Sequence, residues 1–299
     1  MARAVVKRSP KKSPYFTTAA SSRVKREHSE RAVISCAEGI EAVEVKQTVV
    51  TKAKQRKVKS PSCVPFAPTG ASEFGLVQEK LAHDPFRLLI ATIFLNKTRG
   101  KVAIPVLYQL FGKYPTPADL ASANTSDIAE MMQCLGLQNT RAKKCVELSR
   151  KWLETPPTKG VRYRRLHYPK HKDGSDIKPR ETVDEDDSRI AWEAAHLPGI
   201  GPYALDSWRI FCRDEMRGLA KDWKGTGASN SDFVPEWKTV LPQDKELRAF
   251  LAWMWLKEGY EWNCLNGELK PVRKKILRAI EKDRSLYLNH KGRLKVIKR

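Results

Sequence analysis

Several common signatures are missing from this chain of 299 residues. Its six cysteines are widely spaced and form no C-x-x-C pair, which argues against a zinc ribbon, a thiol redox motif or a disulfide framework. There is no run of about 18 apolar residues that would span a bilayer, and no apolar signal core follows Met1. We therefore expect a soluble intracellular protein with reduced thiols, no membrane partner, and neither a metal nor another cofactor.

Acidic residues are also scarce. The chain has 34 Asp and Glu against 56 Lys and Arg, which gives a formal net charge of +22. Such an excess favours polyanionic partners, because basic side chains that neutralise phosphates release the condensed counterions of nucleic acid. Nucleic acid is the leading class of partner, and the 41% of hydrophobic residues can supply a real core.

The charge is spread unevenly, and this suggests a domain organisation. Residues 1–70 hold 15 basic and 5 acidic residues with few aromatics, so we expect a disordered basic tail. Its clusters at Lys7–Lys12 and Lys52–Lys59 are typical of nuclear localisation signals or DNA tethers, the alternative being a solvated tail. On this basis we expect a nuclear protein.

A folded region is predicted over residues 71–270, with polar insertions at about 154–188 and 217–238, and residues 271–299 read as a helix and a basic tail. Asp84 and Pro85 are suited to the N-cap and first position of a helix whose following residues are almost all apolar. A helix without a polar face should lie centrally, which predicts an all-α domain. The basic half of the first insertion either touches DNA or is a plain surface loop.

The stretch from Leu197 to Gly201, Leu-Pro-Gly-Ile-Gly, precedes a predicted helix. Two glycines that flank the apolar Ile200 suit a hairpin in which the backbone takes positive φ and approaches another molecule closely. The helix that follows offers unpaired N–H groups and the positive end of its dipole, so Gly199, Ile200 and Gly201 are candidates for binding a DNA phosphate. The alternative is an ordinary glycine-rich loop between packed helices.

Several blocks, in this order, resemble the helix-hairpin-helix DNA glycosylases, in particular the mismatch-specific thymine/uracil glycosylase domain of the methyl-CpG-binding-domain repair protein. The resemblance rests on the blocks Val77–Glu79, His83–Thr98, Leu135–Leu137, Gly199–Cys212 and Pro242–Asp244. It implies two helical subdomains with the active-site cleft between them. The substrate would be double-stranded DNA with a mismatched or damaged base. The protein would act as a monomer, and abasic-site repair enzymes would process its product.

The resemblance also implies roles for individual residues. Lys97 and Leu137 match the finger and wedge that fill the gap left by a flipped nucleotide. The family has arginine where Lys97 stands, so the charge is kept and planar stacking is lost. Gln78 matches the amide that reads a flipped pyrimidine, and Tyr203 matches the aromatic residue that lines the pocket.

Asp244 matches the catalytic aspartate of the family. Cleavage of an N-glycosidic bond develops positive charge on the sugar, and a carboxylate can stabilise that charge and orient a water molecule. From the sequence alone, Asp244 is also a plain N-cap of the helix that follows it, and Asp206, Asp214, Asp222 and Asp232 are competing acids. Asp206 is interpreted as structural.

Two departures from other branches of the superfamily narrow the predicted chemistry. Bifunctional relatives carry a lysine two residues after the second hairpin glycine, and this chain has Tyr203 there, which cannot form an imine. Some relatives carry a four-cysteine iron–sulfur cluster late in the chain, where only Cys264 is found here. The prediction is a monofunctional enzyme that removes thymine or uracil opposite guanine, without a cofactor. Two alternative functions stay open: a glycosylase for oxidised pyrimidines or mispaired adenine, and a non-catalytic helix-hairpin-helix DNA-binding factor.

Overall fold

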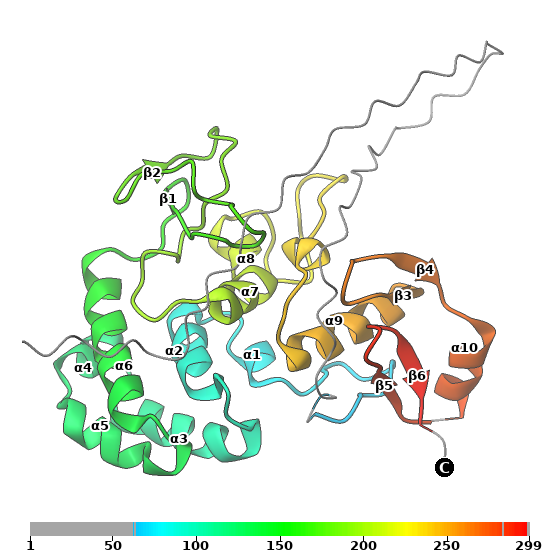
Figure 1. The fold of residues 1–299 in the computed structure, drawn as a ribbon, viewed down its shortest axis with the longest axis horizontal. Helices are drawn as coiled ribbons and strands as arrows, with labels where there is room; N and C mark the ends of the chain where they lie inside the picture. The colour runs from blue at the N-terminus through cyan, green and yellow to red at the C-terminus, as the bar shows by residue number, and fades with distance from the viewer. Residues whose placement is uncertain (1–61, 63, 283, 298–299) are drawn as a thin grey trace, which may run out of the picture. The chain divides into compact units, whose positions relative to one another are not determined.

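The computed structural model describes residues 62, 64–282 and 284–297. These residues are mostly helical (Figure 1). The α-helices are α1 (Val77–Lys80), α2 (Pro85–Leu95), α3 (Gly100–Lys113), α4 (Pro117–Ser122), α5 (Thr125–Met131), α6 (Gln138–Glu154), α7 (Pro202–Phe211), α8 (Arg213–Met216), α9 (Lys245–Lys257) and α10 (Lys274–Glu281). Short 3₁₀ turns are formed by η1 (Gln133–Leu135) and η2 (Glu236–Thr239).

Three antiparallel pairs of short strands complete the secondary structure of the described residues. They are β1 (Arg162–Tyr163) with β2 (Thr182–Val183), β3 (Tyr260–Trp262) with β4 (Leu269–Pro271), and β5 (Leu286–Leu288) with β6 (Leu294–Val296). No helix in the part of the chain that the structure describes is both long and apolar enough to cross a membrane.

Helix α2 is the central helix, as its sequence predicts. Asp84 is its N-cap and accepts a hydrogen bond of 2.9 Å from the Arg87 backbone N–H, and Pro85 takes the first position. Leu88, Leu89 and Ile90 are fully buried, and each such side chain contributes about 1.5–3 kcal/mol on burial. The helix packs against α3, α6 and α7, so it joins the helices before the hairpin to the helix after it.

The helices form two groups. Helices α4 and α5 pack on α6 in one group, and α9 packs on β3 in the other, with α2 and α7 in contact between them (Figure 1). The core of the second group is rich in aromatic rings: Phe250 of α9 lies 5.0 Å from Phe211 of α7, measured between ring centroids. The predicted all-α class is therefore confirmed, with the small sheets as additions.

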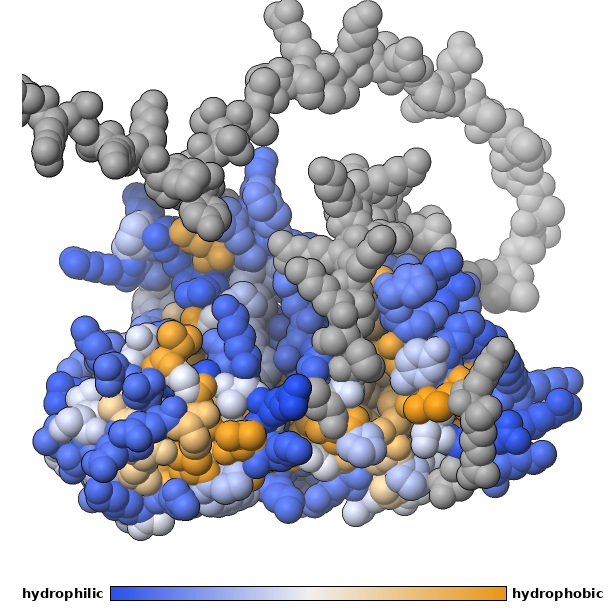
Figure 2. Space-filling model, turned by 60° about the horizontal axis from the view of Figure 1, so that its bottom comes forward, coloured by the Kyte–Doolittle hydropathy of each residue, from blue (hydrophilic) through white to orange (hydrophobic). Residues whose placement is uncertain are grey.

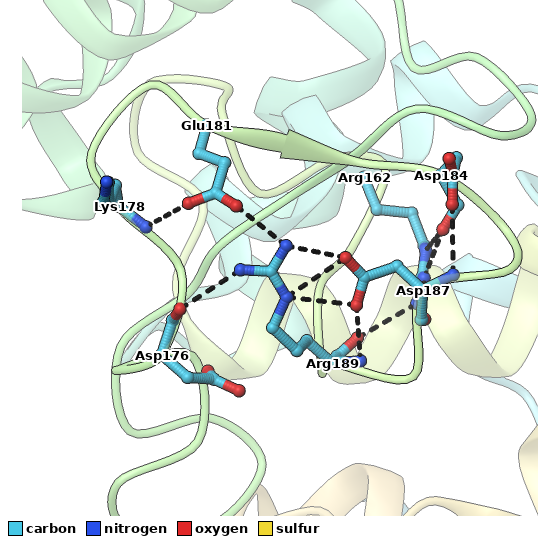
Figure 3. Close-up of polar contacts among 7 residues, drawn as sticks. All are labelled: Arg162, Asp176, Lys178, Glu181, Asp184, Asp187 and Arg189. Carbon is cyan, nitrogen blue, oxygen red and sulfur yellow. Dashed lines mark hydrogen bonds and ion pairs between the residues drawn. The ribbon is translucent and has the colours of Figure 1, made fainter.

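The segment between α6 and α7 contains the first predicted insertion and is folded. It has a small hydrophobic cluster of its own, made of Ile177, Val183 and Ala191. Its acidic end is held by two arginines (Figure 3): Arg189 pairs with Asp187 at 2.6 Å and with Glu181 at 2.7 Å. Arg162 donates to the backbone carbonyls of Asp184 and Asp187. In the acidic run, Asp187 is thus paired within the insertion, whereas Glu185 pairs with Arg217, at the end of α8, at 3.6 Å.

The two ends of the chain were predicted to be basic tails. The predicted nuclear localisation clusters at Lys7–Lys12 and Lys52–Lys59 lie outside the described residues. Closer to the domain, Phe66 packs edge-on against Phe74, with ring centroids 5.8 Å apart. At the other end, the stretch after α10 forms the β5–β6 hairpin, in which Leu286 and Leu294 are buried.

Candidate DNA-binding and catalytic site

The hairpin leads directly into α7. Gly199 has a φ of 81°, so the prediction of a left-handed backbone is right for this residue. Gly201 has a φ of −119° and a ψ of −173°, which is extended backbone, so the same prediction is wrong for it. Ile200, between them, is buried and fixes the loop to the core. The hairpin therefore presents backbone rather than side chains at its tip.

Gln78 and Tyr203 are brought together from α1 and α7. The Gln78 side chain is buried, and its Nε2 donates a hydrogen bond of 3.0 Å to Tyr203 Oη. Burial raises the pKa of Tyr203, and the nearby carboxylate of Asp244 raises it further. Tyr203 is therefore a neutral phenol at physiological pH, with its hydroxyl fixed by an amide that is itself out of reach of bulk solvent.

Asp244 is the N-cap of α9, as the plain interpretation of the sequence predicts. Its Oδ1 accepts hydrogen bonds from the backbone N–H of Glu246, at 2.8 Å, and of Leu247, at 3.0 Å. No described residue donates a hydrogen bond to Oδ2. Burial raises the pKa of this carboxyl, although the two backbone hydrogen bonds oppose the shift. One oxygen is thus used to cap the helix and the other remains available, so capping and catalysis are compatible.

The predicted finger and wedge lie on two exposed loops. Lys97, after α2, has a φ of 59°, and Leu137, before α6, has a φ of 53°. Left-handed backbone is unusual for side chains of this size and costs of order 1–3 kcal/mol unless the surroundings hold it. Leu137 is 69% exposed, which is unusual for leucine next to a well-packed core. Both side chains thus lie on exposed loops with a left-handed backbone. That they fill the gap left by a flipped nucleotide stays a prediction.

Arg141 holds both loops in place. Its guanidinium donates to the carbonyls of Phe94 (2.8 Å) and Asn96 (2.9 Å), at the end of α2, and to that of Gly136 (3.0 Å), beside Leu137. The side chain is buried, which is uncommon for arginine. Its position four residues before the core residue Cys145 was the available signal, because residues i and i+4 share a helix face.

Asp206 has a partner that sequence reasoning missed. Tyr168 of the insertion donates a hydrogen bond of 2.8 Å to Asp206 Oδ1, and both side chains are buried. Burial raises the pKa of Asp206 to about 6, and the Asp244 carboxylate also contributes. The insertion therefore contacts a buried carboxyl group that interacts electrostatically with the candidate catalytic aspartate. Nothing in the sequence indicated this, since Tyr168 stands in a polar stretch without periodicity.

The pKa of Asp206 predicts a pH dependence of stability. Between the unfolded pKa of about 3.9 and the folded pKa of about 6, the folded protein keeps a proton that the unfolded chain has lost, so stability from this group decreases as the pH rises. Asp206→Asn removes the titration and keeps an acceptor for Tyr168. Its free energy of unfolding relative to wild type should rise by about 2 kcal/mol from pH 4 to pH 7, measured by urea unfolding. A difference that is the same at both pH values would contradict the assignment.

Comparison with known proteins identifies the family. Residues 90–257, more than half of the chain, match the family described as "HhH-GPD superfamily base excision DNA repair protein". The chain belongs to this superfamily. Its fold is that of the helix-hairpin-helix DNA glycosylases, and the family membership predicted from the sequence is confirmed.

Curated relatives agree with this assignment. A thymine-DNA glycosylase from Aeropyrum pernix is 34% identical over 67 residues, which cover 22% of this chain and 30% of that protein. A methyl-CpG-binding domain protein 4-like protein from Arabidopsis thaliana is 27% identical over 141 residues, which cover 47% and 24%. The chain thus spans about a quarter to a third of the length of these relatives. Among solved structures, a thermostable thymine-DNA glycosylase matches 63% of this chain and 80% of its own at 19% identity, with a TM-score of 0.35.

Proposed function

We propose that the protein is a monofunctional DNA glycosylase that hydrolyses the N-glycosidic bond of thymine or uracil mispaired with guanine. The observation that carries the proposal is the convergence of Gln78, Tyr203 and Asp244, in which a buried amide donates a hydrogen bond to a half-buried phenol beside a half-buried, helix-capping carboxylate. The superfamily and the thymine-DNA glycosylase among its relatives support it.

In the proposed reaction the hairpin binds the DNA backbone, and Leu137 and Lys97 occupy the gap left when the target nucleotide rotates out of the helix. The Gln78 amide, a donor and an acceptor side by side, pairs with the edge of the pyrimidine. Figure 2 shows one face of the molecule, on which hydrophobic residues are interspersed among prevailing hydrophilic ones.

Asp244 acts on the sugar. As the bond between the base nitrogen and C1′ breaks, positive charge develops on the sugar, and the carboxylate stabilises it. The base leaves with the electron pair of the broken bond. Oδ2 orients a water molecule whose oxygen bonds to C1′; the water loses one proton and the departing base takes up one proton, so that the neutral free base and an abasic site remain. The enzyme would act in the nucleus as a monomer, with enzymes that process abasic sites downstream.

A panel of duplexes tests the substrate class. In single-turnover reactions we expect base release from G·T and G·U duplexes and none from duplexes with an oxidised pyrimidine or with adenine opposite oxidised guanine. Release only from the latter would favour the alternative glycosylases. Tight binding without release from any duplex would favour a non-catalytic DNA-binding factor.

The absence of a lysine at position 203 predicts the outcome of borohydride trapping. An imine between the enzyme and the abasic sugar requires an amine, and Tyr203 offers a phenol. We expect no covalent adduct with a G·U duplex under conditions in which base release is complete, with a bifunctional glycosylase as the positive control. An adduct in good yield would overturn the monofunctional assignment.

A further inference from the structure

The insertion between α6 and α7 carries a group of arginines, most of which stabilise the insertion itself. Arg162 and Arg189 hold its acidic end (Figure 3), and Arg164 donates a hydrogen bond of 2.9 Å to the carbonyl of Ile177. Each of these guanidiniums is bonded within the insertion. They have structural roles and are poor candidates for binding another molecule.

Arg165 is different. It is half-buried, and its guanidinium forms no hydrogen bond or ion pair with any described residue. Its Nη2 lies 3.9 Å from the position that a Cβ on Gly201 would occupy, so the guanidinium lies directly against the hairpin. On the other glycine, the Lys144 side chain of α6 lies 3.3 Å from the Cβ position of Gly199. The Arg165 guanidinium and the aliphatic carbons of the Lys144 side chain, from separate segments, thus lie against the two hairpin glycines.

The backbone of Arg165 is firmly held. Gly174 has a φ of 72°, and a Cβ there would lie 2.8 Å from the carbonyl oxygen of Arg165, so the loop closes tightly on this residue. Three residues further on, the Tyr168 ring packs edge-on against Trp192, with centroids 5.5 Å apart, while its hydroxyl binds Asp206. Arg165 is therefore presented by a rigid support, which lowers the entropy cost of its binding an anion.

We propose that Arg165 is a DNA-binding residue supplied by the insertion, and that its guanidinium neutralises a backbone phosphodiester bound at the Gly199–Gly201 hairpin. A planar guanidinium matches two phosphate oxygens at once, which the backbone amides of a hairpin alone cannot neutralise. The inference rests on the proposed function only in that the hairpin binds duplex DNA. It assigns the insertion a function in substrate affinity and not in the chemical step.

Duplex binding as a function of salt tests the inference. Fluorescence anisotropy with an undamaged labelled duplex should show a slope of log affinity against log salt that is smaller by about 1 for Arg165→Ala than for wild type. With this difference in slope, the ratio of the wild-type affinity to the Arg165→Ala affinity should be about ten times larger at 0.1 M salt than at 1 M salt. Arg165→Lys should keep most of the slope. Single-turnover base release from a G·U duplex by Arg165→Ala should be slower than wild type at subsaturating enzyme and approach the wild-type rate as the enzyme concentration is raised, because the substitution weakens binding and not the chemical step.

Arg180→Ala is the matched control. Arg180 is an exposed arginine of the same insertion, next to Glu181 in the acidic end, so its loss removes the same charge away from the hairpin. It should retain the wild-type slope. Equal slopes for Arg165→Ala and wild type, or equal losses in both arginine variants, would overturn the inference while the wild type still binds and releases base. A wild type that neither binds duplex nor releases base would overturn the proposed function instead.

Discussion

Asp244→Asn should lower the single-turnover rate of base release from a G·U duplex by about 10²–10³-fold, the usual effect of removing one preorganised electrostatic group from an active site. The substitution changes the charge and little else. Asparagine is as good an N-cap as aspartate, so its side-chain oxygen can still accept from the backbone N–H groups of Glu246 and Leu247. The loss should therefore appear in the rate and not in the folding.

Asp84→Asn provides the control for this variant. Asp84 also caps a helix through its side chain, accepting from the Arg87 N–H, and it carries no predicted role in the reaction. It should release base at the wild-type rate. If Asp244→Asn released base as fast as Asp84→Asn, Asp244 would not be the catalytic carboxylate.

Glu193→Gln should destabilise the protein by about 3–5 kcal/mol, measured as the free energy of unfolding in urea. Glu193 is 1% exposed and accepts three hydrogen bonds, of 3.0, 3.2 and 3.3 Å, from the Arg213 guanidinium. The substitution leaves a buried arginine with only part of its compensation. Arg213 keeps one hydrogen bond of 2.9 Å to Glu236.

The ion pairs around Glu193 connect the segments that carry the site. Glu236, shortly before Asp244, binds both Arg209 of α7, at 2.6 Å, and Arg213 of α8, at 2.9 Å. Burial disfavours its charge, but the two arginines outweigh this effect and lower its pKa. Arg209 also lies over the ring of Trp192, at 4.3 Å from the centroid. The cluster thus connects the segment before the hairpin, which contains Trp192 and Glu193, to the segment before Asp244, which contains Glu236.

Glu258→Gln is the control for the Glu193 variant. Glu258 pairs with Lys238 at 3.0 Å, but its side chain is 42% exposed, and exposed pairs contribute about 0–1 kcal/mol. If Glu193→Gln lowered the free energy of unfolding as little as Glu258→Gln, the prediction that the buried ion pairs stabilise the fold would be wrong.

The sequence predicted the parts of the fold whose signals are local. Asp84 and Pro85 mark the start of α2 by capping chemistry alone, and the apolar stripe after Asp244 gives α9 directly. Gly199 was predicted correctly because a left-handed turn selects glycine. Gly201 was not, because its extended backbone suits any residue and its role depends on what lies against it.

The contacts that join distant segments could not be predicted in the same way. Tyr168 and Asp206 are 38 residues apart, and no periodicity links an insertion to a helix face. The ion pairs of Glu193 and Glu236 likewise depend on how two polar segments fold over α7. Arg141 shows the same limit, since the five backbone and side-chain oxygens that accept from its guanidinium belong to residues 5 to 48 positions away in the sequence.

The most direct test of the account is single-turnover release of uracil from two duplexes that differ only in the opposite base, guanine or adenine, by wild type and Asp244→Asn. We expect wild type to release uracil opposite guanine, to be markedly slower opposite adenine, and to lose about 10²–10³-fold of its G·U rate in the variant. Absence of release from the G·U duplex by wild-type protein that binds it, or full activity in Asp244→Asn, would contradict the account.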